Sequence, residues 1–488
     1  MSELQLLTWI PLVPLLAAVG VVVTGKSPNL REAVTIISGV ILFALVATLG
    51  SNADWANSAT LVLAEPLPGV ALAFELEPLG LLFAMVASFL WPVTTVYAIG
   101  YMRSHNEDNQ TRFYAAFAVS IAAVMGIALS ANMLTLFLFY EILTLATYPL
   151  VTHAGNDKAR HAGRIYLGIL IGTSVVFLLL AMIWTWHIAG TLDFTSGGVF
   201  PEGTDTVVLS VLLVLYVFGT GKAAVMPFHR WLPAAMVAPT PVSALLHAVA
   251  VVKAGVFTIL KVSVYIFGID TIADLAVADW LAGLAALTIL LASLVAMTKD
   301  NLKARLAYST VSQLGYIVLG AMLGVAAGVV GGGMHIAMHA FGKITLFFCA
   351  GAIMVAAHKT KVSELNGLGR RMPLTMLAFL IGALSIVGLP PFGGTWSKWM
   401  LVQGTLDTGI WMLTAVLLLS SLLNVAYLVV IPVRSFFTEP AEPAEGVKEA
   451  PLASLLAIGV VVTGCLLLFL WPEPIYQLMD NLVPVNTN

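Results

Sequence analysis

Apolar residues fill long stretches of the chain, and short polar connections separate these stretches. A helix that crosses a membrane needs roughly 20 mostly apolar residues, and fourteen stretches meet this requirement. They begin near Leu4, Ala33, Leu79, Phe113, Asn132, Ala162, Val207, Pro239, Ala276, Arg305, Gly332, Pro373, Gly409 and Pro451. The pattern therefore predicts an all-α polytopic membrane protein with about fourteen transmembrane helices.

Basic residues alternate between the connections. Cytoplasmic connections are enriched in lysine and arginine, and 17 of the 22 basic residues lie in or beside odd-numbered connections, whereas the even ones contain none. The even connections carry acids instead, as in the acidic loop around residues 51–78. A miscount by one span would destroy this alternation. It therefore supports the number of spans and predicts both termini on the periplasmic, outer side of a cell inner membrane.

Composition excludes several classes of protein. Hydrophobic residues make up 60% of the 488 positions and charged residues 10%, which rules out a soluble fold. The net charge of -3 offers no basic surface for nucleic acid. Cys349 and Cys465 both lie in apolar stretches, so no disulfide framework is expected. The only long polar segment late in the chain, residues 438–450, is typical of a flexible cytoplasmic linker.

Five lysines and one glutamate fall inside predicted spans: Glu141, Lys222, Lys253, Lys261, Lys343 and Lys398. A charge near the bilayer centre costs from about 2.5 to over 10 kcal/mol, so each such residue suggests a function. Glu141 lies about nine residues into its span, roughly 13 Å deep, which is too far for a short side chain to reach water. Lys261 lies near the outer end of its span, where its long stem could carry the ammonium to the interface. We therefore predict a function for Glu141 and Lys253, and only an interfacial position for Lys261.

Three of the ionisable residues of the eleventh span, His335, His339 and Lys343, recur every four residues. This spacing places them on one face of a helix, with a rise of roughly 6 Å between neighbours. Water between the members would let such a stripe relay protons. A zinc site is the alternative, but the zinc protease motif needs a glutamate directly after the first histidine, where this chain has Ile336. We expect no metal.

Two spans contain residues that interrupt helices. The seventh reads FGTGKAAVMP (218–227) and the twelfth GLPPFGGTWSK (388–398). The expected breaks involve Gly219, Gly221, Pro227, Gly388, Pro390 and Pro391. Unwound backbone at membrane depth is tolerated only where protein or water covers it, and paired interrupted spans point to a transport site. Packing kinks are the alternative explanation.

Several motifs make the chain resemble the antiporter-like subunits of respiratory complex I and, more closely, the D-type subunits of Mrp-type multisubunit sodium/proton antiporters. The motifs are LFLFYE (136–141), FHRWLPAA (228–235), APTPVSALLH (238–247), LKARLAYSTVSQLGY (302–316), HIAMHAFGKITLFFCAGA (335–352) and GLPPFGGTWSK (388–398). The resemblance implies two inverted five-helix repeats, residues 111–266 and 267–437, with the seventh and twelfth helices broken. Three helices (1–110) precede the repeats, and the linker with a last helix (438–488) follows them.

The resemblance also implies roles for individual residues. Glu141 would pair with Lys222, Lys253 would be the central lysine, and Lys398 the terminal lysine of a proton path that includes His335, His339 and Lys343. His153, His229 and His247 are possible accessory residues.

The predicted function is proton translocation within a multisubunit Na⁺/H⁺ antiporter. The alternatives are the same role in a redox-driven complex, of the NADH:quinone oxidoreductase or membrane hydrogenase type, or energy coupling for inorganic carbon uptake. The chain has two cysteines and no Gly-x-Gly-x-x-Gly turn, so we expect no cofactor and no redox centre of its own. Expected partners are other membrane subunits, protons, Na⁺ and the bilayer.

Overall fold

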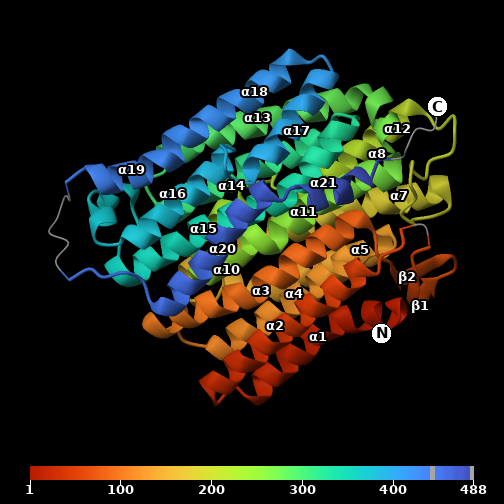
Figure 1. The fold of residues 1–488 in the computed structure, drawn as a ribbon. Helices are drawn as coiled ribbons and strands as arrows, with labels where there is room; N and C mark the ends of the chain where they lie inside the picture. Colours follow the sequence, from red (N-terminus) through yellow and green to blue (C-terminus); the bar gives the residue numbers. More distant parts are fainter. Residues whose placement is uncertain (56, 440–445, 484–488) are drawn as a thin grey trace.

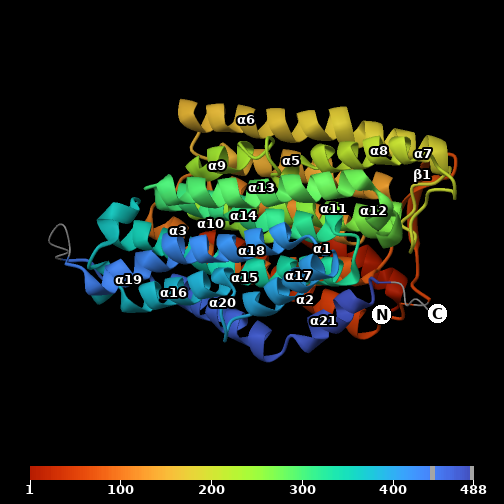
Figure 2. The ribbon, with the colours of Figure 1, turned by 90° about the horizontal axis from the view of Figure 1, so that it is seen from above.

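The computed structural model describes residues 1–55, 57–439 and 446–483, apart from the side chains of Leu67 and His247. Its helices run side by side in one long bundle (Figures 1 and 2). The predicted linker at 438–450 falls partly outside the described residues.

Ten helices in the described part of the chain are long and apolar enough to cross a membrane. The uninterrupted ones are α1 (Glu3–Val23), α2 (Pro28–Ser51), α3 (Pro78–Ser104), α4 (Gln110–Ala128), α5 (Met133–Val151), α13 (Ala276–Thr298), α15 (Ala326–Ala357) and α20 (Leu452–Leu470). Two contain a π-helical turn: α6 (Asp157–Thr173), η1 (Ser174–Leu178) and α7 (Leu179–Ala189); and α18 (Trp411–Asn424), η8 (Val425–Val429) and α19 (Val430–Phe437). The all-α membrane fold is confirmed.

The remaining four predicted spans are also helical. One is the continuous helix α14 (Leu302–Met322). The seventh comprises α8 (Thr206–Gly219), η2 (Gly221–Ala223), α9 (Trp231–Ala234) and η3 (Ala235–Val237), and the eighth α10 (Thr240–Ala244), η4 (Leu245–Val249), α11 (Val251–Lys261) and η5 (Val262–Phe267). The twelfth comprises α16 (Pro373–Val387) and α17 (Gly394–Asp407). The seventh and twelfth spans are therefore broken where glycine and proline predict it. Gly388, with φ +87°, ends α16 in the left-handed conformation that glycine adopts most easily.

One end of the bundle carries a feature that the hydropathy pattern did not predict. Within the acidic loop, β1 (Leu61–Leu67) and β2 (Val70–Phe74) pair antiparallel, with Leu61 opposite Phe74 and Leu67 opposite Val70. Figures 1 and 2 place this hairpin at the same end of the bundle as α7 and α12 (Ile269–Asp274). We call this the hairpin end; it also includes the α4–α5 and α7–α8 connections. Short helices elsewhere are η6 (Val362–Leu365), η7 (Leu368–Arg370) and α21 (Glu473–Asp480).

Helix α11 packs directly on the broken seventh span because Gly255 lacks a side chain. A methyl group at Gly255 would overlap the backbone of Lys222 and Ala223. We expect Gly255→Ala to force the two elements apart and to cost about 1–3 kcal/mol, the usual range for overpacking. The melting temperature of the purified protein in detergent measures this loss. Gly283→Ala in α13 is the matched control, since nothing lies within 4 Å of the added methyl. Equal melting temperatures for the two variants would contradict the prediction.

Candidate functional site

All five lysines predicted inside spans are buried. Lys222, Lys253, Lys261 and Lys343 have no exposed surface, and Lys398 is 7% exposed. Their ammonium groups bond to protein atoms of other helices or of the connections between helices, as described below. None of them therefore points into the lipid.

Lys222 lies in η2, where the seventh span unwinds beside α5. Its Nζ donates to the Tyr140 carbonyl oxygen (2.8 Å) and to Thr144 Oγ1 (2.6 Å), and lies 3.2 Å from the centroid of the Tyr140 ring. The Tyr140 hydroxyl in turn accepts a hydrogen bond from the Lys222 backbone nitrogen at 3.1 Å. The broken helix thus places this ammonium on one face of α5.

Glu141 is partly exposed and does not contact Lys222 in this conformation. Among the residues that the structure describes, no ion pair within 4.0 Å includes Glu141, and its buried Oε1 has no hydrogen-bond partner. The reason is rotational: successive residues of a helix point about 100° apart. Lys222 contacts the face of α5 that carries Tyr140 and Thr144, so the direct pair that the resemblance implies is not formed here.

A direct contact joins the central lysine to the histidine stripe. Lys253 Nζ on α11 lies 2.7 Å from His339 Nδ1 on α15. The rings of His339 and His335 follow each other along α15, 5.7 Å apart and 25° from parallel. His335 continues the contacts through Nδ1 to Ser397 Oγ (2.9 Å) and Nε2 to Gln313 Oε1 (3.2 Å). The stripe therefore connects α11 to α14 and α17 in the middle of the bundle.

Lys398 lies at the α17 end of this set. Its Nζ donates to the Val387 carbonyl oxygen (3.1 Å) and Ser421 Oγ (3.0 Å), and lies 4.6 Å from the centroid of the Tyr316 ring. That ring stacks on His335 at 5.7 Å. Tyr316 thus lies between Lys398 and the histidine stripe.

The ammonium of Lys343 contacts α14 and not the two histidines of the stripe. Its Nζ donates to Ser309 Oγ at 2.8 Å, and the Tyr427 hydroxyl donates to the same oxygen at 3.3 Å. Ser309, Gln313 and Tyr316 share one face of α14 at intervals of four and three residues. Sequence reasoning missed these partners, although their spacing in the motif LKARLAYSTVSQLGY was a signal for them.

The structure corrects the expected position of Lys261. Instead of reaching the interface, its Nζ forms an ion pair with Glu77 Oε1 at 3.4 Å and donates to the Ser130 carbonyl oxygen at 2.6 Å. The α4–α5 connection and the start of α3 cover the end of α11, which closes the route to the surface that the stem would have taken.

Two of the accessory histidines, His153 and His229, lie outside these contacts. His153 follows α5, where its Nε2 lies 3.9 Å from Glu107 Oε2; burial lowers the pKa of this imidazole and raises the pKa of the Glu107 carboxyl. His229 lies between η2 and α9, where its ring centroid is 6.1 Å from that of Tyr308. His247 lies in η4, and its side chain is outside the part of the chain that the structure describes.

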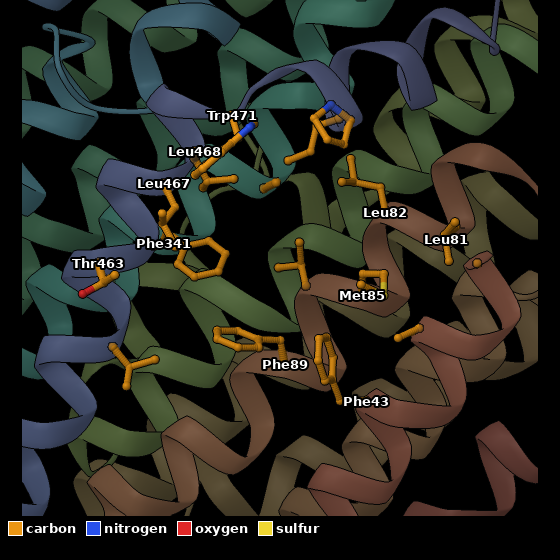
Figure 3. Close-up of a pocket in the computed structure, with 18 of the residues that line it drawn as sticks. Phe43, Leu81, Leu82, Met85, Phe89, Phe341, Thr463, Leu467, Leu468 and Trp471 are labelled. Carbon is orange, nitrogen blue, oxygen red and sulfur yellow. The ribbon is translucent and has the colours of Figure 1, made fainter.

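A large apolar cavity lies apart from the ionisable residues (Figure 3). It has a volume of about 1200 Å³ and lies between α2, α3, α15, α20 and α21. Phe43, Phe89, Phe341, Leu468 and Trp471 are among its lining residues, and none of the predicted proton-transfer residues contributes to it. Apolar walls of this kind favour lipid chains or other apolar groups. Because they offer an ion no polar partners, the cavity is not a path for ions.

Comparisons with known proteins agree on one family. Residues 130–424 match the model described as "NADH:quinone oxidoreductase/Mrp antiporter, TM". NADH-quinone oxidoreductase subunit N of Desulforudis audaxviator is 33% identical over 479 residues, which cover 93% of each chain. Subunit L of Mycobacterium tuberculosis (strain CDC 1551 / Oshkosh) is 30% identical over 419 residues, and the match covers 82% of this chain but only 64% of that protein.

Two solved structures share the fold. A chain in the Mrp complex from Dietzia sp. DQ12-45-1b superimposes with a TM-score of 0.86 over 99% of this chain and 97% of that one, at 22% identity. A chain of the membrane-bound sulfane sulfur reductase, an archaeal respiratory membrane complex, gives a TM-score of 0.85 at 22% identity over 98% of both chains. At this identity the likeness establishes the fold alone.

Proposed function

Since the chain belongs to the transmembrane family shared by NADH:quinone oxidoreductases and Mrp antiporters, we propose that it translocates protons within a multisubunit Na⁺/H⁺ antiporter. It would do so in the cell inner membrane, together with other membrane subunits. The lysine and arginine alternation supports an orientation with both termini and the hairpin end on the outer side.

One observation carries the proposal: the buried contacts that run from Lys253 through His339 and His335 to the surroundings of Lys398. Lysine and histidine each hold or release one proton, and burial of a lysine favours its neutral form. A proton leaving the Lys253 ammonium can pass to His339 Nδ1, since the two nitrogens already lie at hydrogen-bond distance. Water between the more distant groups would complete transfer to either side.

Lys222, in the other half of the chain, would donate protons to this path. Its ammonium rests on Tyr140 and Thr144 beside Glu141, whose buried oxygen lacks a hydrogen-bond partner in the described residues. A rotation of α5 or a shift of η2 would bring the carboxylate to the ammonium. We propose that this alternation between paired and unpaired states controls when Lys222 releases its proton.

We also propose that residues 111–266 and 267–437 are the two inverted repeats that the resemblance implies. The seventh and twelfth spans are both broken, and the eighth and thirteenth both contain π-helical turns, η4 and η5 in the eighth and η8 in the thirteenth. The lysine of each broken span lies over a tyrosine ring, Lys222 over Tyr140 and Lys398 over Tyr316. These correspondences support the proposal that the two segments are repeats of one structural unit.

The second candidate is proton pumping in a redox-driven complex, which the likeness to an NADH-quinone oxidoreductase subunit N favours. Membrane vesicles made with and without the chain, alongside its partner subunits, distinguish the two. We expect added Na⁺ to dissipate an imposed pH gradient only when the chain is present. Acidification that requires NADH and this chain, and does not respond to Na⁺, would reject the antiporter in favour of the redox complex.

A further inference from the structure

A second buried charged site lies at the hairpin end, outside the proposed proton path. Lys261 on α11 has no exposed side-chain surface, and its partner Glu77, directly before α3, is 15% exposed. Glu77 also accepts hydrogen bonds from the Tyr265 hydroxyl (2.9 Å) and from the backbone nitrogens of Leu79 (3.0 Å) and Gly80 (2.7 Å). The carboxylate is thus held in place, and a small part of the Glu77 side chain is exposed.

The Lys261 ammonium lies among aromatic rings. Its Nζ is 4.1 Å from the centroid of the Phe194 ring and 5.4 Å from that of Phe257. A cation is attracted to ring faces and gains more where water is excluded. These contacts favour the protonated form of the lysine, and the carboxylate is its only charged neighbour within 4.0 Å in the described residues.

Helix α11 aligns this pair with the central lysine. Lys253, Phe257 and Lys261 are four residues apart and share one face, so the two lysines are separated by roughly 12 Å along the helix axis. Phe257 lies between them, fully buried, with its ring 5.1 Å from the Phe83 ring. An aromatic block therefore closes the short route from the centre to the hairpin end.

We propose that Glu77 and Lys261 exchange protons with the aqueous phase at the hairpin end and that Phe257 is the gate between them and Lys253. The idea rests on the proposed function. The Lys261 ammonium gives a proton to the Glu77 carboxylate, which leaves a neutral amine and a carboxylic acid. The acid releases that proton to water through its exposed edge. When the Phe257 ring moves aside, the Lys253 ammonium returns a proton to Lys261 through water and becomes neutral.

A purely structural ion pair is the competing explanation, and arginine separates the two. Arginine keeps the positive charge and can still bind a carboxylate, but it does not deprotonate in proteins. A structural pair would tolerate Lys261→Arg and fail in Lys261→Met. A group that must release its proton fails in both variants.

The test measures sodium-driven proton flux in liposomes that contain the purified complex, with a pH-sensitive dye, and the amount of assembled complex for each variant. We expect Lys261→Arg, Lys261→Met and Glu77→Gln each to reduce flux at least tenfold while assembly is retained. Asp274→Asn, an exposed acid at the same end, is the matched control and should conduct normally. Wild-type flux in Lys261→Arg or Lys261→Met would overturn the proposal.

Phe257→Ala covers the case in which the charged-site variants do not assemble. Removing the ring should let protons leak down an imposed pH gradient without Na⁺, at a rate several times that of the wild type, whereas Phe257→Leu should stay closed. An unchanged leak in Phe257→Ala would overturn the gate. A wild-type complex that conducts no protons would refute the proposed function itself, whereas normal flux in Lys261→Arg beside an inactive Lys253→Met would refute only this inference.

Discussion

Lys253→Met should abolish proton transport while the protein still assembles. Methionine is close to lysine in length and packs well in apolar surroundings. The substitution therefore keeps the packing around α11 and removes the amine that lies 2.7 Å from His339 Nδ1 and can pass a proton to it. An added barrier of about 1.4 kcal/mol already slows a step tenfold. Losing the nearest proton carrier adds much more. Dye-monitored proton flux in vesicles measures the loss.

Lys158→Met is the control for this prediction, because Lys158 is an exposed lysine outside the buried network. Its flux should equal that of the wild type. The assembled amount of Lys253→Met, judged by native electrophoresis, should also be unchanged. A correctly assembled Lys253→Met complex with normal flux would remove the central step of the proposed path.

The second large effect is expected at the Lys222 site. Lys222→Met and Glu141→Gln should each abolish transport, the first by removing the proton carrier and the second by removing the charge that attracts it. Glu141→Gln breaks no hydrogen bond of Oε1 in the described structure, so assembly should be retained. Thr144→Val, which loses the 2.6 Å bond to Lys222 Nζ, should slow transport several-fold without stopping it. The same flux assay ranks the three variants.

Glu202→Gln in the exposed α7–α8 connection is the matched control for the loss of one negative charge. If Glu141→Gln transports protons as fast as this control, the carboxylate does not regulate Lys222. The absence of an ion pair would then describe the working cycle as well as this conformation.

The positions of the buried ionisable groups along the chain could be read from the sequence, but their partners could not. The stripe of His335, His339 and Lys343 follows from helical spacing alone, and its first two members do stack. Its third member, Lys343, instead donates a hydrogen bond to Ser309 on α14. Helical spacing defines a shared face, whereas the neighbour opposite each residue decides its contact.

Lys261 shows the same limit more strongly. Its distance from the end of the span predicted an interfacial ammonium, because a long stem near a helix end normally reaches water. In the fold, the segment before α3 supplies Glu77 from 184 residues earlier in the chain, and the α4–α5 connection supplies Ser130. A hydropathy pattern does not predict which loops will cover a helix end.

The sequence by itself determined the helical membrane fold, the number of spans and the places where two of them break. These features depend on the transfer energy of each segment and on the local backbone preferences of glycine and proline, which a single stretch of chain already contains. Only the tertiary structure decided that Lys253 meets His339, that Lys261 meets Glu77 and that Glu141 stands apart from Lys222. Such contacts depend on the rotation and neighbours of each helix, and a turn of about 100° exchanges one residue for the next.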